Sequence, residues 1–362
     1  MWIFETKTIV LLLDAGGTNL VFTALQYGKE IVSPITKPTN GHDLELCLKT
    51  IIVGFEEVMK ALPMPATAIS FAFPGPADYP NGIIGDLNNL PGFRGGVPLG
   101  PILQEHFGIP VFINNDGDLF AYGEALAGIL PEMNRQLQEH GNPKRYHNLI
   151  GITLGTGMGA GVVRNGELYL GDNSIGSEAW ILGNRYTPDK FAEVGISTEA
   201  IKKHYLDKTG TAGLMPKDIF EIATGKQAGN ASVAREAFDL MGRNLGEVVA
   251  NLITLYDGIV VLGGGIAAAS ELFMPALMNE LHGKFVVDGK VFPRLVQKVN
   301  NYGKETDRAE FLRKHSKELP IPGTNKTVSY DPVPRVAIAI SSIGASTAIA
   351  LGAYSFALNK IG

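Results

Sequence analysis

Leu11-Leu12-Leu13-Asp14-Ala15-Gly16-Gly17-Thr18-Asn19-Leu20-Val21-Phe22 is one of two stretches of the same design in this chain. The other is Ile150-Gly151-Ile152-Thr153-Leu154-Gly155-Thr156-Gly157-Met158-Gly159-Ala160-Gly161-Val162-Val163. In each stretch a tight turn of Gly and Thr joins an apolar strand to a second apolar run. Glycine reaches positive φ at little cost and has no side chain, so the backbone N–H groups of such a turn can converge on an anion. Two such turns facing each other would hold the phosphates of a nucleotide, which points to phosphoryl transfer.

The composition limits the class of protein. A chain of 362 residues is too long for one ordinary core, so we expect two domains. The net charge of −5 argues against a nucleic acid or an anionic membrane as partner. The single cysteine, Cys47, indicates no disulfide, no His or Cys pair has zinc spacing, and no apolar run is long enough to span a membrane. The short apolar run Thr8–Leu13 ends in Asp14 without a cleavage site, so a cytoplasmic protein is expected.

Alternative interpretations of the glycine motifs have to be weighed. Gly155 to Ala160 fits the dinucleotide fingerprint G-x-G-x-x-A by letter, but that fingerprint must open a helix. Here Asn165-Gly166 predicts a hairpin instead, so an NAD-dependent oxidoreductase is disfavoured. A Walker motif is absent from the sequence. Gly263-Gly264-Gly265 follows the apolar strand Ile259–Leu262, where its backbone would lie against adenine or ribose, although a tight strand-to-helix crossing explains it equally well.

Four carboxylates are candidates for chemistry. Asp116 follows the strand Pro110–Ile113, at the kind of strand end where α/β proteins bind ligands, and would accept a proton from a substrate hydroxyl; a helix cap is the ordinary explanation. Asp14 would face a phosphate-bound Mg²⁺ through water, or simply shape its turn. Glu178 and Glu193 lie in apolar surroundings and would accept hydrogen bonds from sugar hydroxyls, although surface or capping glutamates are commoner.

The remaining pattern organises the chain into two domains. Helices are predicted over residues 43–62, 118–129 and 232–256, a long Gly-, Asn- and Pro-rich loop over 78–98, and an exposed polar connection over 131–147. Residues 283–334 are charged and interrupted by Gly and Pro, which predicts a peripheral insertion. The small apolar residues 343–358 predict a helix that folds back on the first half. The smaller domain is therefore expected to hold 1–130 with about 343–362, and the larger domain 131–342.

Taken together, these segments resemble the ROK family of repressors, uncharacterised frames and sugar kinases, in the superfamily of sugar kinases, Hsp70 and actin. The resemblance covers almost the whole chain outside 283–334. Asp14-Ala15-Gly16-Gly17-Thr18-Asn19 resembles the first phosphate motif, Leu154 to Gly161 the second, and Val261 to Ile266 the adenosine motif. Phe73-Pro74-Gly75-Pro76-Ala77-Asp78 with Asn89-Leu90 resembles the P-G-P-x-D…N-L loop beside the sugar, and Asn115-Asp116-Gly117-Asp118 with Gly123-Glu124 the family's N-D-A-N…G-E.

The resemblance implies an α/β fold of the two-domain, actin-like (ribonuclease H-like) ATPase type with a cleft between the domains. It makes Asp116 the catalytic base and implies ATP and Mg²⁺ as cofactors, with Asp14 facing the metal through water. The implied sugar ligands are Asn89, Asn115, Glu178 and Glu193. The implied nucleotide-binding residues are Asp14, Gly16, Gly17, Thr18, Asn19, Gly155, Thr156, Gly157, Gly263, Gly264 and Gly265.

This sequence departs from the family in two places. Ile181 stands where the family has a histidine that contacts the sugar, and the zinc run C-x-C-G-x-x-G-C is missing. We therefore expect no zinc site and a sugar pocket with one polar contact fewer.

The expected protein is an ATP-dependent hexose kinase, acting at the 6-hydroxyl and forming a homodimer. Glucose is the default sugar, with N-acetylmannosamine, fructose or allose open, and polyphosphate is an alternative donor. The rival interpretation is a non-catalytic sensor of sugar or nucleotide. The first glycine turn begins by residue 14, so a helix-turn-helix like that of the family's repressors is not expected before it.

Overall fold

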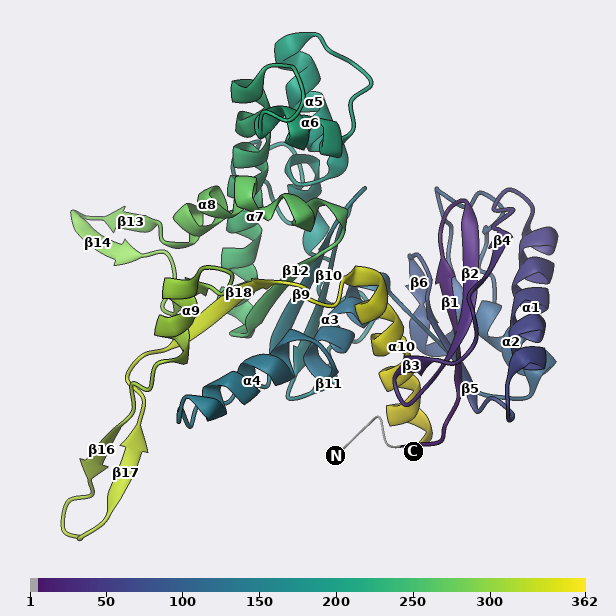
Figure 1. Ribbon diagram of the computed structural model, residues 1–362, viewed down its shortest axis with the longest axis horizontal. Helices are drawn as coiled ribbons and strands as arrows, with labels where there is room; N and C mark the ends of the chain where they lie inside the picture. The colour runs from purple at the N-terminus through teal and green to yellow at the C-terminus, as the bar shows by residue number, and fades with distance from the viewer. Residues whose placement is uncertain (1–5) are drawn as a thin grey trace. The chain divides into compact units, whose positions relative to one another are not determined.

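The computed structural model describes residues 6–362, and these residues form two compact units (Figure 1). Unit 1 contains 6–127, 167–177 and 345–362, and unit 2 contains 128–166 and 178–344. The first five residues of the predicted smaller domain lie outside the described residues. Residues 167–177, which the sequence analysis assigned to the larger domain, are grouped with unit 1. No helix among residues 6–362 has the length and apolar character needed to cross a bilayer.

Unit 1 is built on a mixed sheet of order β3-β2-β1-β5-β8, with β4 paired to β2. β1 runs antiparallel to β2 and parallel to β5, which in turn runs parallel to β8. Its strands are β1 (Val10–Ala15), β2 (Asn19–Gln26), β3 (Lys29–Glu30), β4 (Ile35–Pro38), β5 (Ala68–Ala72), β6 (Ala77–Asp78), β7 (Ile83–Ile84), β8 (Val111–Asn114) and β11 (Glu167–Leu168). Its helices are α1 (Leu44–Ala61), η2 (Tyr79–Asn81), α2 (Leu99–Phe107), α3 (Asp116–Leu126) and α10 (Ala345–Ile361).

The sheet of unit 1 is buried on both faces because successive residues of β1 point to opposite sides. Leu11 and Leu13 join the core that contains Cys47 of α1, whereas Val10 and Leu12 join the core that contains α10. Burial raises the pKa of the Cys47 thiol to about 11, with a smaller contribution from Asp43. Cys47 is therefore an inert core residue.

The C-terminal helix α10 packs in unit 1, so the prediction that it returns to the first half of the chain is confirmed. The Tyr354 hydroxyl accepts a hydrogen bond from the Tyr27 backbone N–H (3.0 Å) and donates to the Thr8 carbonyl (3.3 Å). α10 also crosses α3 at close range, since a Cβ placed on Gly123 would lie 1.9 Å from the Ala348 carbonyl oxygen. The helix that begins at Asp116 is thus held by the end of the chain.

Unit 2 is built on the sheet order β10-β9-β12-β18-β15, and the turn after β10 leads to β11 through Asn165 and Gly166, both at positive φ. Its strands are β9 (Leu149–Leu154), β10 (Met158–Arg164), β12 (Ile259–Gly263), β13 (Lys284–Val287), β14 (Lys290–Pro293), β15 (Lys298–Asn301), β16 (Lys317–Pro320), β17 (Thr327–Tyr330) and β18 (Arg335–Ile340). Its helices are α4 (Ile129–Glu139), η3 (Ala179–Ile181), η4 (Ala192–Gly195), α5 (Thr198–Thr209), α6 (Pro216–Ala223), α7 (Ala231–Tyr256), η5 (Gly265–Ala269), α8 (Ser270–Leu281) and α9 (Glu305–Leu312).

Three predictions about these elements are corrected. Residues 129–139 form helix α4 rather than an exposed connection, because Ile129, Met133 and Leu137 bury one face of an otherwise polar helix. The loop over 78–98 contains the small β6–β7 hairpin and is ordered further by pairing of Ile84 with Val97. The segment 283–334 is not wholly peripheral, because β15 pairs with β18 at the edge of the main sheet of unit 2.

Candidate active site

The first glycine turn closes the β1–β2 hairpin of unit 1. Ladder pairing continues to Ala15 opposite Leu20, and the Gly16 N–H donates to the Asn19 carbonyl at 2.9 Å. A Cβ on Gly16 would lie 2.9 Å from that same oxygen, so Gly16 has no room for a side chain. No other residue lies within 4 Å of the Cβ position at Gly17. The turn is therefore tight at Gly16 and open at Gly17, with Thr18 and Asn19 exposed.

A threonine that the sequence analysis missed braces this turn. The Thr39 hydroxyl donates to the Gly16 carbonyl (2.6 Å), and the Thr39 N–H donates to the Thr18 carbonyl (3.0 Å). Thr39 is buried. It follows β4, which pairs with β2, so only the fold brings it to the turn and no local pattern marks it.

Strand register gathers the chemical residues of unit 1 at one edge of its sheet. Asp14 lies opposite Ala72, and Ala72 lies opposite Asn114, so β1, β5 and β8 end side by side. Asn115 and Asp116 come directly after β8. The register thus brings together Asp14 and the Asn115–Asp116 pair, at the carboxyl ends of parallel strands where α/β proteins bind ligands.

The capping interpretation of this pair holds for Asn115 rather than for Asp116. Asn115 is the N-cap of α3, and its side-chain oxygen accepts from the Gly117 N–H at 2.8 Å. α3 therefore begins at Asp116, two residues earlier than predicted. Among residues 6–362 the Asn115 amide NH₂ has no hydrogen-bond partner, so it is available to a ligand.

Asp116 has an exposed side chain, and Oδ1 accepts a hydrogen bond from the Gly117 N–H at 2.9 Å. Protein atoms around the carboxyl nevertheless displace enough water to raise its pKa above the ordinary value of 3.8. The backbone hydrogen bond opposes this rise, and the negative charge of Asp14 adds to it. A carboxylate made more basic in this way is suited to accept a proton.

Asn89 lies on the ordered loop that follows β7. Its side chain is exposed and makes no hydrogen bond within the described part of the chain. The neighbouring Leu90 is buried against Gly41, and the Gly92 N–H donates to the Gly41 carbonyl at 2.9 Å. The loop therefore has a fixed position within unit 1, although no hydrogen bond joins Asn89 to Asn115 or Asp116 within residues 6–362.

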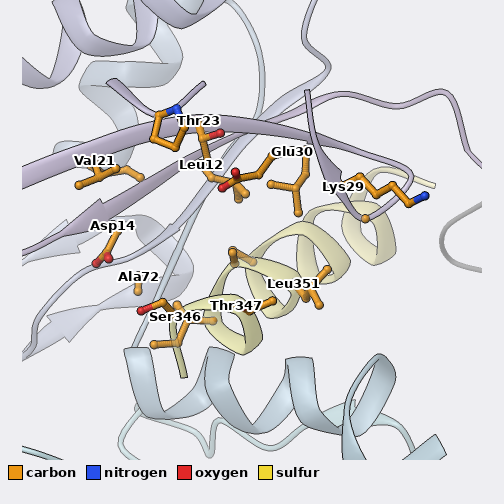
Figure 2. A pocket seen from close by; sticks show the side chains of 17 residues that line it. Leu12, Asp14, Val21, Thr23, Lys29, Glu30, Ala72, Ser346, Thr347 and Leu351 are labelled. Atoms are coloured by element: carbon orange, nitrogen blue, oxygen red, sulfur yellow. The ribbon is translucent and has the colours of Figure 1, made fainter. Parts of the chain in front are cut away.

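A cavity of about 600 Å³ lies in unit 1 between β1, β2 and α10 (Figure 2). Asp14, Ala72, Ser346 and Thr347 line one part of it, and Lys29 and Glu30 line another. Most of the lining is apolar, and none of the predicted sugar ligands contributes to it. This cavity is consequently not the predicted sugar site, although it reaches the Asp14 carboxylate.

The second glycine turn joins β9 to β10 in unit 2. The Gly155 N–H donates to the Gly157 carbonyl at 3.0 Å, and Thr156 at the tip is exposed. Thr198, a second residue that the sequence analysis missed, fixes the turn from outside. Its N–H and hydroxyl both donate to the Gly155 carbonyl, at 2.9 and 2.8 Å. Thr198 begins α5, so its role depends on where that helix starts rather than on a local motif.

Glu193 is attached to this turn. Its Oε2 accepts from the Met158 N–H at 2.8 Å, and a Cβ on Gly157 would lie 2.4 Å from the same oxygen. Within residues 6–362, Oε1 has no hydrogen-bond partner. Gly157 therefore makes room for the carboxylate, and unit 2 brings the predicted phosphate turn and the predicted sugar ligand Glu193 together.

Gly263, Gly264 and Gly265 lie at the end of β12, next to the same turn. Gly263 is paired with Thr153 of β9. Gly264 has a φ of +87°, and a Cβ there would lie 2.3 Å from the Leu154 carbonyl oxygen, so the tight-crossing interpretation is correct for this residue. Gly265 has no other residue within 4 Å of its Cβ position. An open backbone position therefore remains for a ligand at the start of η5.

Glu178 is exposed, and its carboxylate accepts a hydrogen bond from the Trp180 indole N–H. Trp180 packs edge-on against Phe191, with ring centroids 5.5 Å apart. Ile181, at the position of the family histidine, is 60% exposed and provides no polar group. No hydrogen bond joins Glu178 to Glu193 in the described residues.

The segment between these two glutamates is held by protein contacts. Gly183 pairs with Phe191 at its base, and the Asn184 side-chain oxygen accepts from the Tyr186 and Thr187 N–H groups, both at 3.0 Å. Arg185 forms an ion pair with Glu280 at 2.7 Å. Within residues 6–362, no group of three or more His, Cys, Asp or Glu side chains is arranged to hold a metal ion.

The model of the ROK family matches residues 10–301. A crystal structure of a glucokinase from Parabacteroides distasonis is 48% identical, covers 100% of both chains and superposes with a TM-score of 0.92. A glucokinase from Halalkalibacterium halodurans is 28% identical over 77% of this chain and 88% of its own. An N-acetyl-D-glucosamine kinase from Vibrio cholerae is 27% identical over 70% of this chain and 83% of its own. The predicted fold, the actin-like two-domain ATPase, is confirmed.

Proposed function

We propose that this member of the ROK family, which is a sugar kinase, transfers the γ-phosphoryl group of ATP to the 6-hydroxyl of a hexose. Asp116 is the general base in this proposal. The observation that carries this proposal is the position of Asp116. It stands at the first turn of α3, on the sheet edge that also carries Asp14, with a raised pKa. Asp116 accepts the hydroxyl proton as the oxygen attacks, a contribution typically worth ~10²–10⁴ in rate.

Sugar binding is assigned to Asn89, Asn115, Glu178 and Glu193. Two of them keep free hydrogen-bonding atoms within the described residues, the Asn115 amide NH₂ and Glu193 Oε1. A carboxylate accepts from sugar hydroxyls and an amide both donates and accepts, so these groups suit a polyhydroxylated ligand. Their task is to hold the ring so that one hydroxyl faces Asp116, because phosphoryl transfer depends mainly on positioning and charge stabilisation.

Nucleotide binding is assigned to the glycine turns. Gly16, Gly17, Thr18 and Asn19 with Gly155, Thr156 and Gly157 hold the phosphates through backbone N–H groups and hydroxyls. The open backbone at Gly265 is assigned to the adenosine, with Gly263 and Gly264 forming the tight crossing that leads to it. The Asp14 carboxylate has no hydrogen bond or ion pair within residues 6–362, which fits a residue that meets Mg²⁺ through water. Bound Mg²⁺ would neutralise charge on the transferring phosphate.

Glucose is the sugar we propose. The relative that is 48% identical over its whole length is called a glucokinase. The exposed Ile181 leaves the pocket without the family's histidine, so an N-acetylhexosamine remains the alternative sugar. We also propose that the protein acts in the cytoplasm as a homodimer and binds no nucleic acid, in keeping with its net charge of −5.

The test is ADP release from Mg·ATP across a panel of hexoses and N-acetylhexosamines, with product position read by NMR. We expect glucose to give the highest kcat/KM and the product to carry phosphate on oxygen 6. A control with polyphosphate in place of ATP tests the donor. ADP release with N-acetylhexosamines alone would overturn the assignment of glucose as the substrate. Tight sugar binding without any turnover would favour a non-catalytic sensor.

A further inference from the structure

Two β-hairpins extend from unit 2 without joining its main sheet (Figure 1). β13 and β14 form the first, and β16 and β17 form the second. Each is a separate two-stranded sheet. All eight strand residues of the first hairpin are exposed, and all but Leu319 in the second. We call these hairpins arm 1 (284–293) and arm 2 (317–330).

Arm 1 carries apolar side chains on both faces. Phe285 is paired with Phe292, and Val286 with Val291. On the first face the Arg294 guanidinium lies 5.3 Å from the Phe285 ring and also forms an ion pair with Glu247 at 2.9 Å. On the second face Val286 and Val291 are 69% and 61% exposed. The second face is therefore an apolar surface open to solvent.

Arm 2 is amphipathic. Leu319 is paired with Val328, and Lys317 with Tyr330, so these four side chains share one face. Val328 and Tyr330 are 52% and 48% exposed. The opposite face carries Glu318 and Thr327, joined by a hydrogen bond of 3.0 Å. An alternating pattern of this kind is typical of a strand pair with one face packed on another surface.

Hairpins of this kind are energetically unfavourable in a monomer. A two-stranded hairpin is at best marginally stable in water without a surface to pack on. Exposed apolar strands with free edges also invite pairing with other chains. Each arm nevertheless has a regular register over four residue pairs. A surface that covers the apolar faces would account for both their composition and their order.

The net charge of the arms indicates which kind of surface would cover them. Arms 1 and 2 hold four Lys residues against one Asp and one Glu, a net charge of +2. The whole chain has a net charge of −5, so the remainder holds 27 basic and 34 acidic residues, a net charge of −7. The body of another molecule of this protein is thus complementary in charge to the arms.

We propose that arms 1 and 2 of one molecule dock on the body of a second copy of this chain and build its homodimer. A twofold dimer would use each arm twice and cover both apolar faces. The Val286–Val291 pair and the Val328–Tyr330 pair are the apolar contacts, and the basic residues around them orient the partner.

The test measures the mass of the full-length protein by sedimentation equilibrium between 1 and 50 µM. We expect the wild type at twice 38.7 kDa. The double variants Val286→Glu/Val291→Glu and Val328→Glu/Tyr330→Glu remove apolar contacts and add negative charge that the acidic body repels, so each should raise the dimer dissociation constant at least tenfold. Leu206→Glu replaces a side chain of α5 that is 40% exposed outside the arms, and should leave the mass unchanged.

Folding is checked separately by circular dichroism and the thermal midpoint, which the arm variants should retain because these side chains are exposed. Hydrogen exchange gives a second measurement, with amides of 284–293 and 317–330 becoming more protected as protein concentration rises. A wild type at 38.7 kDa with unprotected arms, or a dimer that survives both double variants, would overturn the proposal. This test requires no sugar or nucleotide, so its result is independent of the kinase reaction.

Discussion

At the residue scale, the Asp116 carboxyl, which we propose as the general base, lowers the stability of the folded protein when it is ionised. Desolvation raises its pKa in the folded protein above 3.8, so the ionised form is less favourable there than in the unfolded chain. At neutral pH this ionisation lowers the free energy of unfolding. The cost disappears as the pH falls below both pKa values, because the carboxyl is then protonated in both states.

We therefore expect Asp116→Asn to increase the free energy of unfolding at pH 7. The increase should shrink as the pH falls through the raised pKa towards 3.8. Urea unfolding at several pH values measures this, with Asp43→Asn as the control, because Asn keeps the cap that Asp43 provides for α1. A variant less stable than wild type at pH 7 would contradict the assigned pKa direction.

The two glycines of the first turn are expected to affect different properties, with Gly16 important for stability and Gly17 for nucleotide binding. Gly16→Ala would place Cβ 2.9 Å from the Asn19 carbonyl oxygen, whereas Gly17→Ala meets no protein atom within 4 Å. We expect Gly17→Ala to keep the thermal midpoint but raise the KM for ATP, since the methyl group occupies space assigned to phosphate. Gly16→Ala should lower the midpoint as well. An unchanged KM in Gly17→Ala would remove the phosphate role from this turn.

At the scale of elements, the sequence predicts the strand–turn–strand units well, because their periodicity and turn residues are local. The β1–β2 and β9–β10 hairpins and the Asn165–Gly166 turn follow from such signals. Helix α4 was missed, because its four buried residues are diluted by a polar face. Thr39 and Thr198 were missed for another reason. Each reaches its glycine turn through tertiary structure, which no spacing along the chain encodes.

The crossing of α3 and α10 makes an element-scale prediction. A Cβ on Gly123 would lie 1.9 Å from the Ala348 carbonyl oxygen, so Gly123→Ala must push the two helices apart. Overpacking of this kind costs about 1–3 kcal/mol. We expect denaturant unfolding to show that loss and kcat to fall with it, because Asp116 is at the start of α3. Gly183→Ala, with no other residue within 4 Å, is the matched control and should change neither quantity.

At the scale of the whole molecule, the metal ion that we expect is the Mg²⁺ bound together with the nucleotide, and we expect no structural metal. The 182–191 segment is held by the Gly183–Phe191 pairing, the Asn184 hydrogen bonds and the Arg185–Glu280 ion pair. We expect EDTA to abolish turnover, Mg²⁺ to restore it, and the thermal midpoint without nucleotide to stay the same. A midpoint that falls in EDTA would indicate a structural metal instead.

The predicted site residues are distributed over both units, and the sequence indicates this distribution only in part. The glycine turns and the carboxylates were named from motifs, and the register of β1, β5 and β8 explains why Asp14 and Asp116 share one edge. The arms of unit 2 were read as a charged insertion. Their charge is visible in the sequence, but the separation of apolar side chains onto exposed faces depends on the strand register.

The most direct test of the central claim compares wild type and Asp116→Asn in phosphoryl transfer from Mg·ATP to glucose, with glucose affinity measured separately by calorimetry. We expect kcat to fall by ~10²–10⁴ while glucose still binds with a Kd close to that of wild type. The Asp43→Asn control should retain full activity. An Asp116→Asn enzyme that turns over like wild type would contradict the assignment of Asp116 as the base.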